Sequence, residues 1–333
     1  MKRLIDVVLY AAVAIMAGPA VPLAGQAVQP ARNLQTSTAP TGFAAKTPWG
    51  EPDLQGLWSN KTITPLERPR ELGTREFYTE QEISERERQA IIRATDEARG
   101  ADARSDVAGA YNDFWWDRGT KDVPTRRTSL IISPANGRIP WRAEVMKQNA
   151  ERAQVRQAML DSPNPVRTWL DVDTGERCIT DGIPWTPGAY NNNYLVVQSP
   201  GTVAILHEMY RELRVIAVGE RPRVNIPQWF GNSYGRWEGN TLVVETENFA
   251  DKSALWWPAA WRQARPSYKV TERFTRADAA TLVYEFTVTD PTLFTSPWTA
   301  QVPMSRAEGQ LFEYACHEGN YAMPSMLGIG RVK

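Results

Sequence analysis

Residues 281–289 have the sequence TLVYEFTVT, in which large apolar side chains stand at every second position. Successive side chains of a β-strand point to opposite faces of the sheet, so the residues at 282, 284, 286 and 288 share one face. Val283, Glu285 and Thr287 share the other face. This period is typical of an antiparallel sheet with one face in water. The stretch therefore predicts a strand in a protein that is mainly β.

Seven further strands are expected in the carboxyl-terminal half of the chain. Turn sequences such as Ser199-Pro200-Gly201 and Trp237-Glu238-Gly239-Asn240 separate them, which predicts an antiparallel meander. About eight strands can close into a barrel, and closure removes the exposed edges of the sheet. The other expected strands are residues 194–198, 202–208, 211–218, 241–249, 268–276, 297–305 and 310–317.

The amino-terminal part lacks this alternation. Residues 48–58, PWGEPDLQGLW, contain too many Pro and Gly for a regular element, which predicts an extended arm packed through Trp49, Leu54 and Trp58. A capping box at residues 79–82 predicts a helix over 79–98, and apolar spacing predicts a second over 142–160. Their expected core residues are Ile83, Ala90, Ile91, Val145, Met146, Ala150, Ala153 and Met159. Residues 129–132 and 138–139 are expected to form a hairpin around Asn136-Gly137.

The first residues have the pattern of an export signal. Lys2 and Arg3 precede an apolar run over 4–18, and a cleavage site is expected after Ala27, which predicts a periplasmic or secreted protein with no integral membrane segment after cleavage. The domains expected are a signal peptide over 1–27, a flexible leader over 28–46 and a single β-rich domain over 47–333. Within that domain, 47–165 form the arm and helical part, and 166–333 form the barrel part.

Charge and cysteine content restrict the partners. The formal net charge is zero, which gives no reason to expect nucleic acid or an anionic membrane as partner. The chain has two cysteines, Cys178 and Cys316, and thiols pair in an oxidising compartment, so a disulfide between them is expected. A metal site built on both thiols is the alternative, although it lacks the C-x-x-C spacing.

Several motifs resemble those of a large family of exported bacterial proteins that has no assigned activity. They are PWGEPDLQGLW (48–58), RCI (177–179), YNNNY (190–194), ILHEM (205–209), GRWEGNTLVV (235–244) and YACHEGNY (314–321). The resemblance covers nearly the whole chain after the expected cleavage site, and it implies no catalytic residues. The carboxyl-terminal half resembles the lipocalin-like barrels, a likeness of fold that carries no function.

The chain has two histidines, and each is followed by a glutamate, as His207-Glu208 and His317-Glu318. We expect both histidines in one pocket, where they act in acid–base chemistry with Tyr210 and Arg211. The expected disulfide places Asp181 nearby as an orienting carboxylate. A zinc protease would need a second histidine at the position of Arg211. The sequence requires no cofactor. A divalent metal bound by His207, His317, Glu208 and Glu318 is the open alternative, as is a purely structural role for the histidines.

Asparagine and aromatic residues suggest a ligand pocket. Asparagine and arginine side chains can neutralise a carboxyl or enolate oxygen, and tryptophans suit flat apolar ligands and sugars. The alternatives are that the asparagines shape a turn and that most of the tryptophans pack in the core. The expected ligand-binding residues are Asn191, Asn193, Tyr194, Trp229, Arg236, Trp237, Trp256, Trp257, Trp298 and Tyr321.

Together these features predict an exported barrel with a pocket rimmed by tryptophans. The pocket is expected to bind a small organic molecule, aromatic or sugar-like, and to act on it as a lyase, isomerase or hydrolase through its histidines. The rival prediction is a non-catalytic periplasmic binding protein or envelope-associated module.

Overall fold

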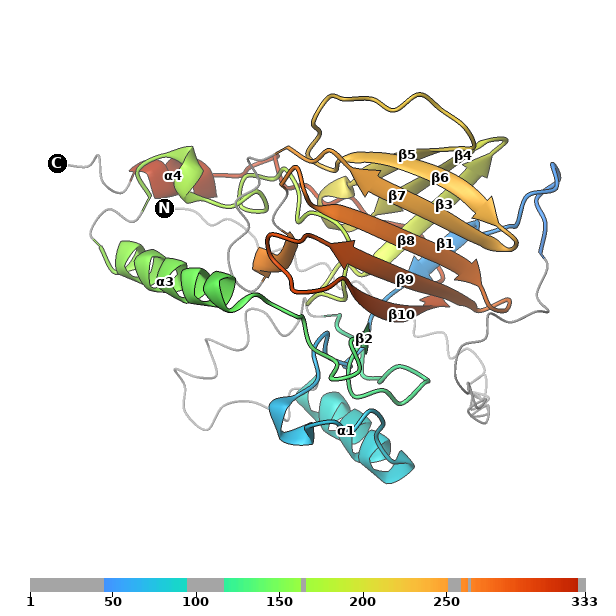
Figure 1. Ribbon diagram of the computed structural model, residues 1–333, viewed down its shortest axis with the longest axis horizontal. Coiled ribbons are helices and arrows are strands. Elements are labelled where there is room, and N and C mark those ends of the chain that lie inside the picture. The colour runs from blue at the N-terminus through green and yellow to red at the C-terminus, as the bar shows by residue number, and fades with distance from the viewer. Residues whose placement is uncertain (1–44, 95–116, 163–165, 251–258, 263–264, 329–333) are drawn as a thin grey trace, which may run out of the picture. The chain divides into compact units, whose positions relative to one another are not determined.

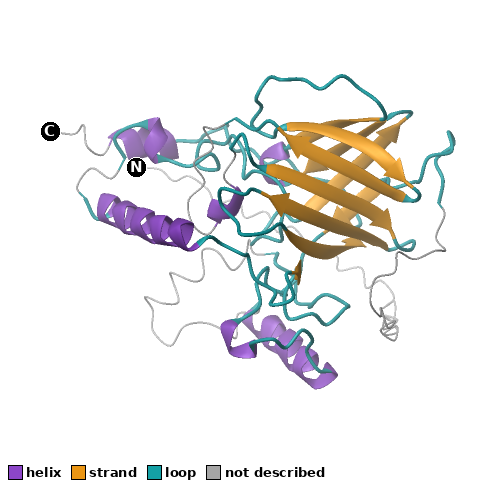
Figure 2. Cartoon of the chain, viewed as in Figure 1, coloured by secondary structure: helices purple, strands orange, loops and turns teal. Residues whose placement is uncertain are grey.

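The computed structural model describes residues 45–94, 117–162, 166–250, 259–262 and 265–328, and all of them belong to one compact unit, Asn33–Lys333. The expected signal peptide, Met1–Arg32 and the other residues before 45 lie outside the described residues. The chain is mainly β (Figure 1, Figure 2). Nine strands form a closed barrel, namely β1 (Gly56–Ser59), β3 (Asn193–Ser199), β4 (Thr202–His207), β5 (Leu213–Val218), β6 (Asn232–Glu238), β7 (Thr241–Glu247), β8 (Lys269–Arg276), β9 (Thr281–Thr289) and β10 (Trp298–Arg306).

The barrel is a meander closed by its first strand. Neighbours pair antiparallel from β3 to β5 and from β6 to β10, and β1 pairs with both β3 and β10. The exception is a short parallel contact between β5 and β6, Ala217↔Tyr234 and Val218↔Gly235. The connection over 219–231 returns the chain to the end at which β5 began, so β6 runs in the same direction. The predicted barrel is confirmed, with nine strands in place of about eight and with one parallel pair.

The inside of the barrel is the apolar face that the alternation predicts. On β9, Leu282, Tyr284, Phe286 and Val288 are each 1% exposed or less, while the residues between them are half-buried. Corresponding residues of β8 and β10 face them across the strand pairs. Burial of these side chains supplies the main free energy that holds the barrel together.

Three local predictions were wrong. Residues 56–59 of the expected arm form β1, because the barrel needs a strand between β3 and β10. Residues 129–139 form no hairpin; β2 (Ile131–Ser133) pairs with β10 instead. Residues 310–317 form no strand, since the closed barrel leaves them no edge to pair with. The strand β6 was not predicted.

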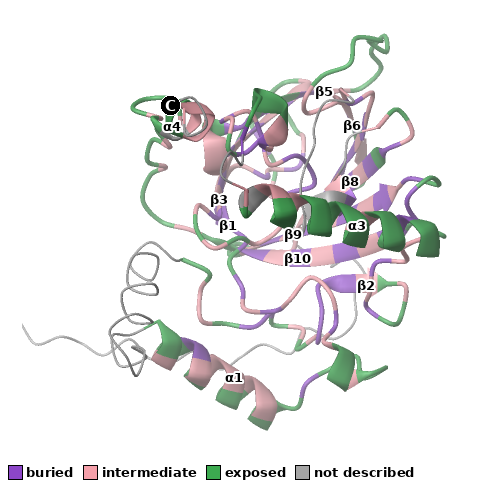
Figure 3. Ribbon diagram, turned by 90° about the vertical axis from the view of Figure 1, so that its left-hand side faces the viewer, coloured by how far each residue is buried: buried purple, intermediate pink, exposed green. Residues whose placement is uncertain are grey.

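The helices lie where the sequence predicts them, but their burial is smaller than expected. Helix α1 (Glu80–Arg93) begins at the expected capping box, where Thr79 accepts a hydrogen bond from the Glu82 N–H and donates its own N–H to the Glu82 carboxylate. Helix α3 is Ala143–Leu160, and the short α4 (Ala322–Gly328) was not predicted. Figure 3 shows mostly exposed surface on α3. Of the expected helix core only Ala90 and Val145 are buried, whereas Ile91 and Met146 are about half exposed.

A buried ion pair lies inside the barrel. The Arg214 guanidinium donates to both Glu272 oxygens, at 2.9 and 2.6 Å, and Tyr284 Oη donates to the same carboxylate at 2.8 Å. Both charged side chains are almost completely buried. Burial is the largest single effect and lowers the pKa of Arg214, but the charge and hydrogen bonds of Glu272, with smaller contributions from Tyr284 and Glu212, together raise it, so the guanidinium stays charged.

The expected disulfide between Cys178 and Cys316 is present, and the two cysteines are 138 positions apart in the sequence. It ties the segment after β10 to the segment that precedes β3. No helix among the described residues is long and apolar enough to cross a membrane.

We expect Glu272→Gln to lower the free energy of unfolding by about 3–5 kcal/mol, because it leaves the buried Arg214 charge without a partner. The double variant Arg214→Met with Glu272→Leu should lose less than the sum of its two single variants, Arg214→Met and Glu272→Leu, since both charges are then absent. Urea unfolding of these four variants measures the losses. Strictly additive losses would show that the two charges do not stabilise each other.

We expect the double variant Cys178→Ser, Cys316→Ser to unfold more easily than the wild type, by up to about 5 kcal/mol, because the disulfide closes a long loop in the unfolded chain. Thermal unfolding with and without a reducing agent measures the difference. Reaction of both cysteines with a thiol reagent in denatured, unreduced protein would contradict the pairing.

Candidate functional site

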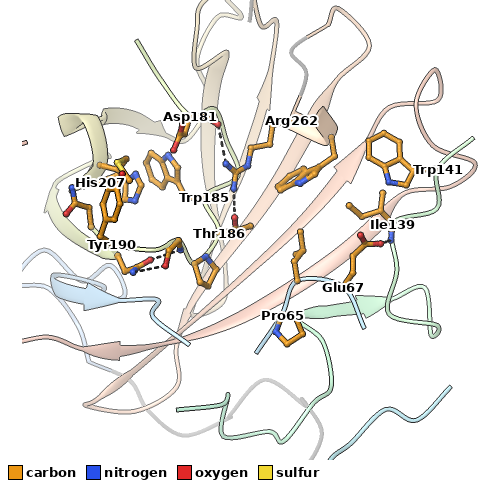
Figure 4. A pocket seen from close by; sticks show the side chains of 17 residues that line it. Pro65, Glu67, Ile139, Trp141, Asp181, Trp185, Thr186, Tyr190, His207 and Arg262 are labelled. Carbon is orange, nitrogen blue, oxygen red and sulfur yellow. Dashed lines mark hydrogen bonds between the residues drawn. The ribbon is translucent and has the colours of Figure 1, made fainter. Parts of the chain in front are cut away.

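A cavity of about 500 Å³ lies at the end of the barrel where β3 begins and β4 ends (Figure 4). Its walls come mostly from connecting segments, over 65–67, 139–141, 181–192 and 261–262, and from His207 at the end of β4. Such a volume suits a small organic molecule. Its ionisable and aromatic lining residues are Glu67, Asp181, His207, Arg262, Trp141, Trp185, Tyr190 and Trp261.

His207 packs against two aromatic rings, Tyr194 and Trp185, which also contact each other. It pairs with Tyr194 across β3 and β4, which points both side chains into the barrel. The two rings stack with centroids 4.6 Å apart, and the Trp185 ring lies 4.8 Å away on tilted planes. The ring of His207 is therefore fixed in orientation, and the residue is 6% exposed.

Glu212 lies behind His207 and organises this wall. Its Oε2 lies 3.7 Å from His207 Nδ1 and accepts a 2.5 Å hydrogen bond from Trp185 Nε1. Its Oε1 accepts a hydrogen bond from the Asp181 backbone N–H at 3.0 Å. His207 Nδ1 is buried and has no hydrogen bond among the described residues. Because Nδ1 faces Glu212, Nε2 is the ring nitrogen that is left for a molecule in the cavity.

Asp181 is a second ionisable group of the same wall. Burial raises the pKa of Asp181, Arg262 opposes this effect, and the Glu212 charge adds to it. A Cβ at Gly175 would lie 2.8 Å from Tyr210 Oη and 2.9 Å from Asp181 Oδ1, so the glycine leaves room for both groups. Burial also raises the pKa of Tyr210.

Arg262 is the single Lys or Arg side chain among the described lining residues. It donates from Nη1 to the Asp181 backbone carbonyl at 3.3 Å and from Nη2 to Thr186 Oγ1. Its guanidinium lies 4.7 Å from the centre of the Trp261 ring. Nothing in the sequence marked Arg262, because its neighbours form no motif.

Some of the expected site residues gather at this cavity. His207 and Asn191 line it, and Tyr194 supports His207 from behind. Tyr210 packs edge-on against Tyr314. Two other expected site residues, Arg211 and Asn193, bond to neighbouring protein groups. Arg211 donates to the Phe312 carbonyl, and Asn193 donates to the Glu208 carboxylate.

The other expected site residues lie outside the cavity lining. His317, Glu318 and Tyr321 are exposed on the segment after β10, so the cavity contains one histidine and not two. Arg236 forms ion pairs with Glu238 and Glu245 on the outer wall of the barrel. Trp298 lies in the buried core, and the partly buried Trp237 packs against that core. The ring centre of Trp229 lies 6.0 Å from the Arg177 guanidinium. Trp256 and Trp257 lie outside the described residues.

The main residues that sequence reasoning missed are Glu212, Trp185 and Arg262. They are far apart in sequence and meet only because strand pairing and the segment after Cys178 bring them together. The proximity of Asp181 to Cys178 was the one available signal for this region. Among the described residues no group of three or more His, Cys, Asp or Glu side chains is arranged to hold a metal ion.

We expect Asp181→Asn to raise the melting temperature at pH 7. The pKa of Asp181 in the folded protein lies above its ordinary value of 3.8, so the loss of folding free energy from this group begins above pH 3.8 and is complete once the pH exceeds the folded-state pKa. Below pH 3.8 the carboxyl is protonated in both states and the cost vanishes. The advantage of the variant should therefore shrink as the pH falls toward that value, as thermal unfolding over a pH series measures. A less stable variant at pH 7 would show that the carboxylate makes a stabilising contact.

A scan against protein-family models and searches of curated proteins and of solved structures found no match. The function of this chain is therefore inferred from the chemistry of the cavity.

Proposed function

We propose that this protein is an exported enzyme that binds a small organic molecule in the cavity and moves a proton on it, with His207 as the general base. The observation that carries the proposal is the pair His207 and Glu212. A histidine that lines a cavity is backed at Nδ1 by a buried carboxylate, while its other nitrogen is left for a ligand.

The position of Glu212 favours base chemistry. A carboxylate beside Nδ1 orients the ring and stabilises the imidazolium that forms when Nε2 takes a proton. The distance of 3.7 Å is longer than a hydrogen bond, and catalytic hydrogen bonds are often long before a ligand binds. Trp185 and the Asp181 backbone hold Glu212 in place, so the carboxylate is already positioned for this role.

Asp181 supplies the complementary acid. Its burial raises its pKa and so favours the protonated form that can donate a proton. Both His207 and Asp181 line the cavity, and Glu212 contacts both residues. One group that takes a proton and one that returns it suit an isomerase or a lyase that acts beside a carbonyl.

A non-catalytic binding protein is the second candidate. The observation that favours it is the packing of the buried His207 against Tyr194 and Trp185, which suits a histidine of the core. A purely structural histidine would also be expected to form a hydrogen bond through its buried Nδ1, and His207 Nδ1 forms none with the described residues. Export itself is supported by the disulfide, because thiols pair in oxidising compartments.

The test measures whether the protein catalyses the exchange of solvent deuterium into small molecules. Purified protein is incubated with a small-molecule extract in D2O, and mass spectrometry identifies compounds that gain deuterium or change in mass. We expect the wild type to label or convert at least one compound. His207→Gln should do so at least about 100-fold more slowly, because a general base typically contributes this factor or more.

The matched control is His317→Gln, which removes the exposed histidine outside the cavity. It should keep the wild-type rate, and circular dichroism should show that both variants are folded. If the wild type changes no compound but releases a bound molecule on denaturation, the protein is a binding module. If His317→Gln loses activity as fully as His207→Gln, the two histidines act together and the cavity described here is not the whole site.

A further inference from the structure

Arg262 is a cation of the cavity lining without a direct ion pair among the described residues. No carboxylate of the described residues lies within ion-pair distance of its guanidinium. Arg262 lowers the pKa of Asp181 through space, but its hydrogen bond goes to the backbone carbonyl of Asp181 and not to the carboxylate. In contrast, Arg214 inside the barrel is paired with Glu272 at 2.6 Å. A partly buried cation without a direct ion pair is costly, so its presence in a cavity points to an anion that arrives with the ligand.

The hydrogen bonds of Arg262 leave donor capacity unused. A guanidinium has five N–H groups in a planar fork that matches a carboxylate. Two contacts go to neutral oxygens, the Asp181 carbonyl and the Thr186 hydroxyl. The Nε atom is buried and has no hydrogen bond among the described residues. These contacts hold the side chain in place and leave N–H groups for another acceptor.

The surroundings of Arg262 define the rest of the ligand. Figure 4 shows Arg262 and Thr186 between the wall that carries His207 and the wall that carries Ile139 and Trp141. A molecule whose anionic group contacts Arg262 therefore meets a proton-transfer group on one side and apolar surface on the other. Glu67 also lines the cavity, and its carboxylate disfavours a doubly charged group such as a phosphate more than a singly charged one.

We infer that the ligand of this cavity is a small monocarboxylate with an apolar or aromatic body, and that Arg262 binds its carboxylate. The inference names the substrate class of the site and rests on the proposed function for the assignment of the cavity as the active site. Arg262 is a binding residue in this scheme, and His207 performs the proton transfer.

The test compares acids with their neutral isosteres. Phenylacetate, cinnamate and indoleacetate, each with its primary amide, are titrated into the wild type by calorimetry, with phenyl phosphate as a further probe. We expect at least one acid to bind about tenfold more tightly than its amide, because one charge-assisted hydrogen bond supplies such a factor. Arg262→Gln should abolish this preference, and Arg262→Lys, which keeps the charge, should retain part of it.

Arg236→Gln is the matched control, since it removes an arginine from the outer wall of the barrel. It should keep the preference for the acid. The inference is wrong if no acid binds more tightly than its amide, if phenyl phosphate binds best, or if Arg262→Gln keeps the preference while folded. Acid binding without any proton transfer in the wild type would overturn the proposed catalysis and leave the substrate class intact.

Discussion

Closure of the sheet by β1 is the constraint on which the rest of the structure depends. This strand has four residues, yet it pairs with β3 on one side and with β10 on the other. Trp58, at its centre, is completely buried and lies opposite both Tyr194 and Arg306. Once the sheet is closed, every second side chain must fit into a limited interior. Polar groups on those positions then require partners, which is why Arg214 and Glu272 form an ion pair there.

The cavity is a consequence of how the barrel ends. The interior is filled with apolar side chains along most of its length, and at the end near His207 the strands give way to connecting segments. Glu212 stands at this border and contacts three parts of the wall, through His207, Trp185 and the backbone of Asp181. A single carboxylate thus couples the packing of the barrel to the orientation of the histidine. Loops that carry functional groups on a rigid barrel are a common arrangement in binding proteins and enzymes.

Sequence alone was sufficient where the signal is local. Alternation revealed most of the barrel strands, and the capping box located the start of α1. It failed where the partner decides the structure: residues 56–59 became a strand because the barrel had two edges to join, and residues 310–317 did not because none was left. The candidate site divides in the same way. His207 stood out by its rarity, whereas Arg262 gains its meaning from residues about eighty positions away. His317 shared the sequence context of His207 but not its place in the fold.

The disulfide also closes part of the chain into a covalent ring. The bond between Cys178 and Cys316 makes a closed ring of the chain between them, and that ring contains every strand from β3 to β10. Asp181, His207 and Arg262 are all members of the ring, whereas the wall supplied by residues 65–67 and 139–141 lies outside it. A single cut in the backbone anywhere within the ring, such as in the exposed connection over 219–228, opens the ring but does not divide the molecule. After such a cut, the disulfide would still join the two fragments that carry Asp181, His207 and Arg262. The fragments would separate only after the disulfide is reduced.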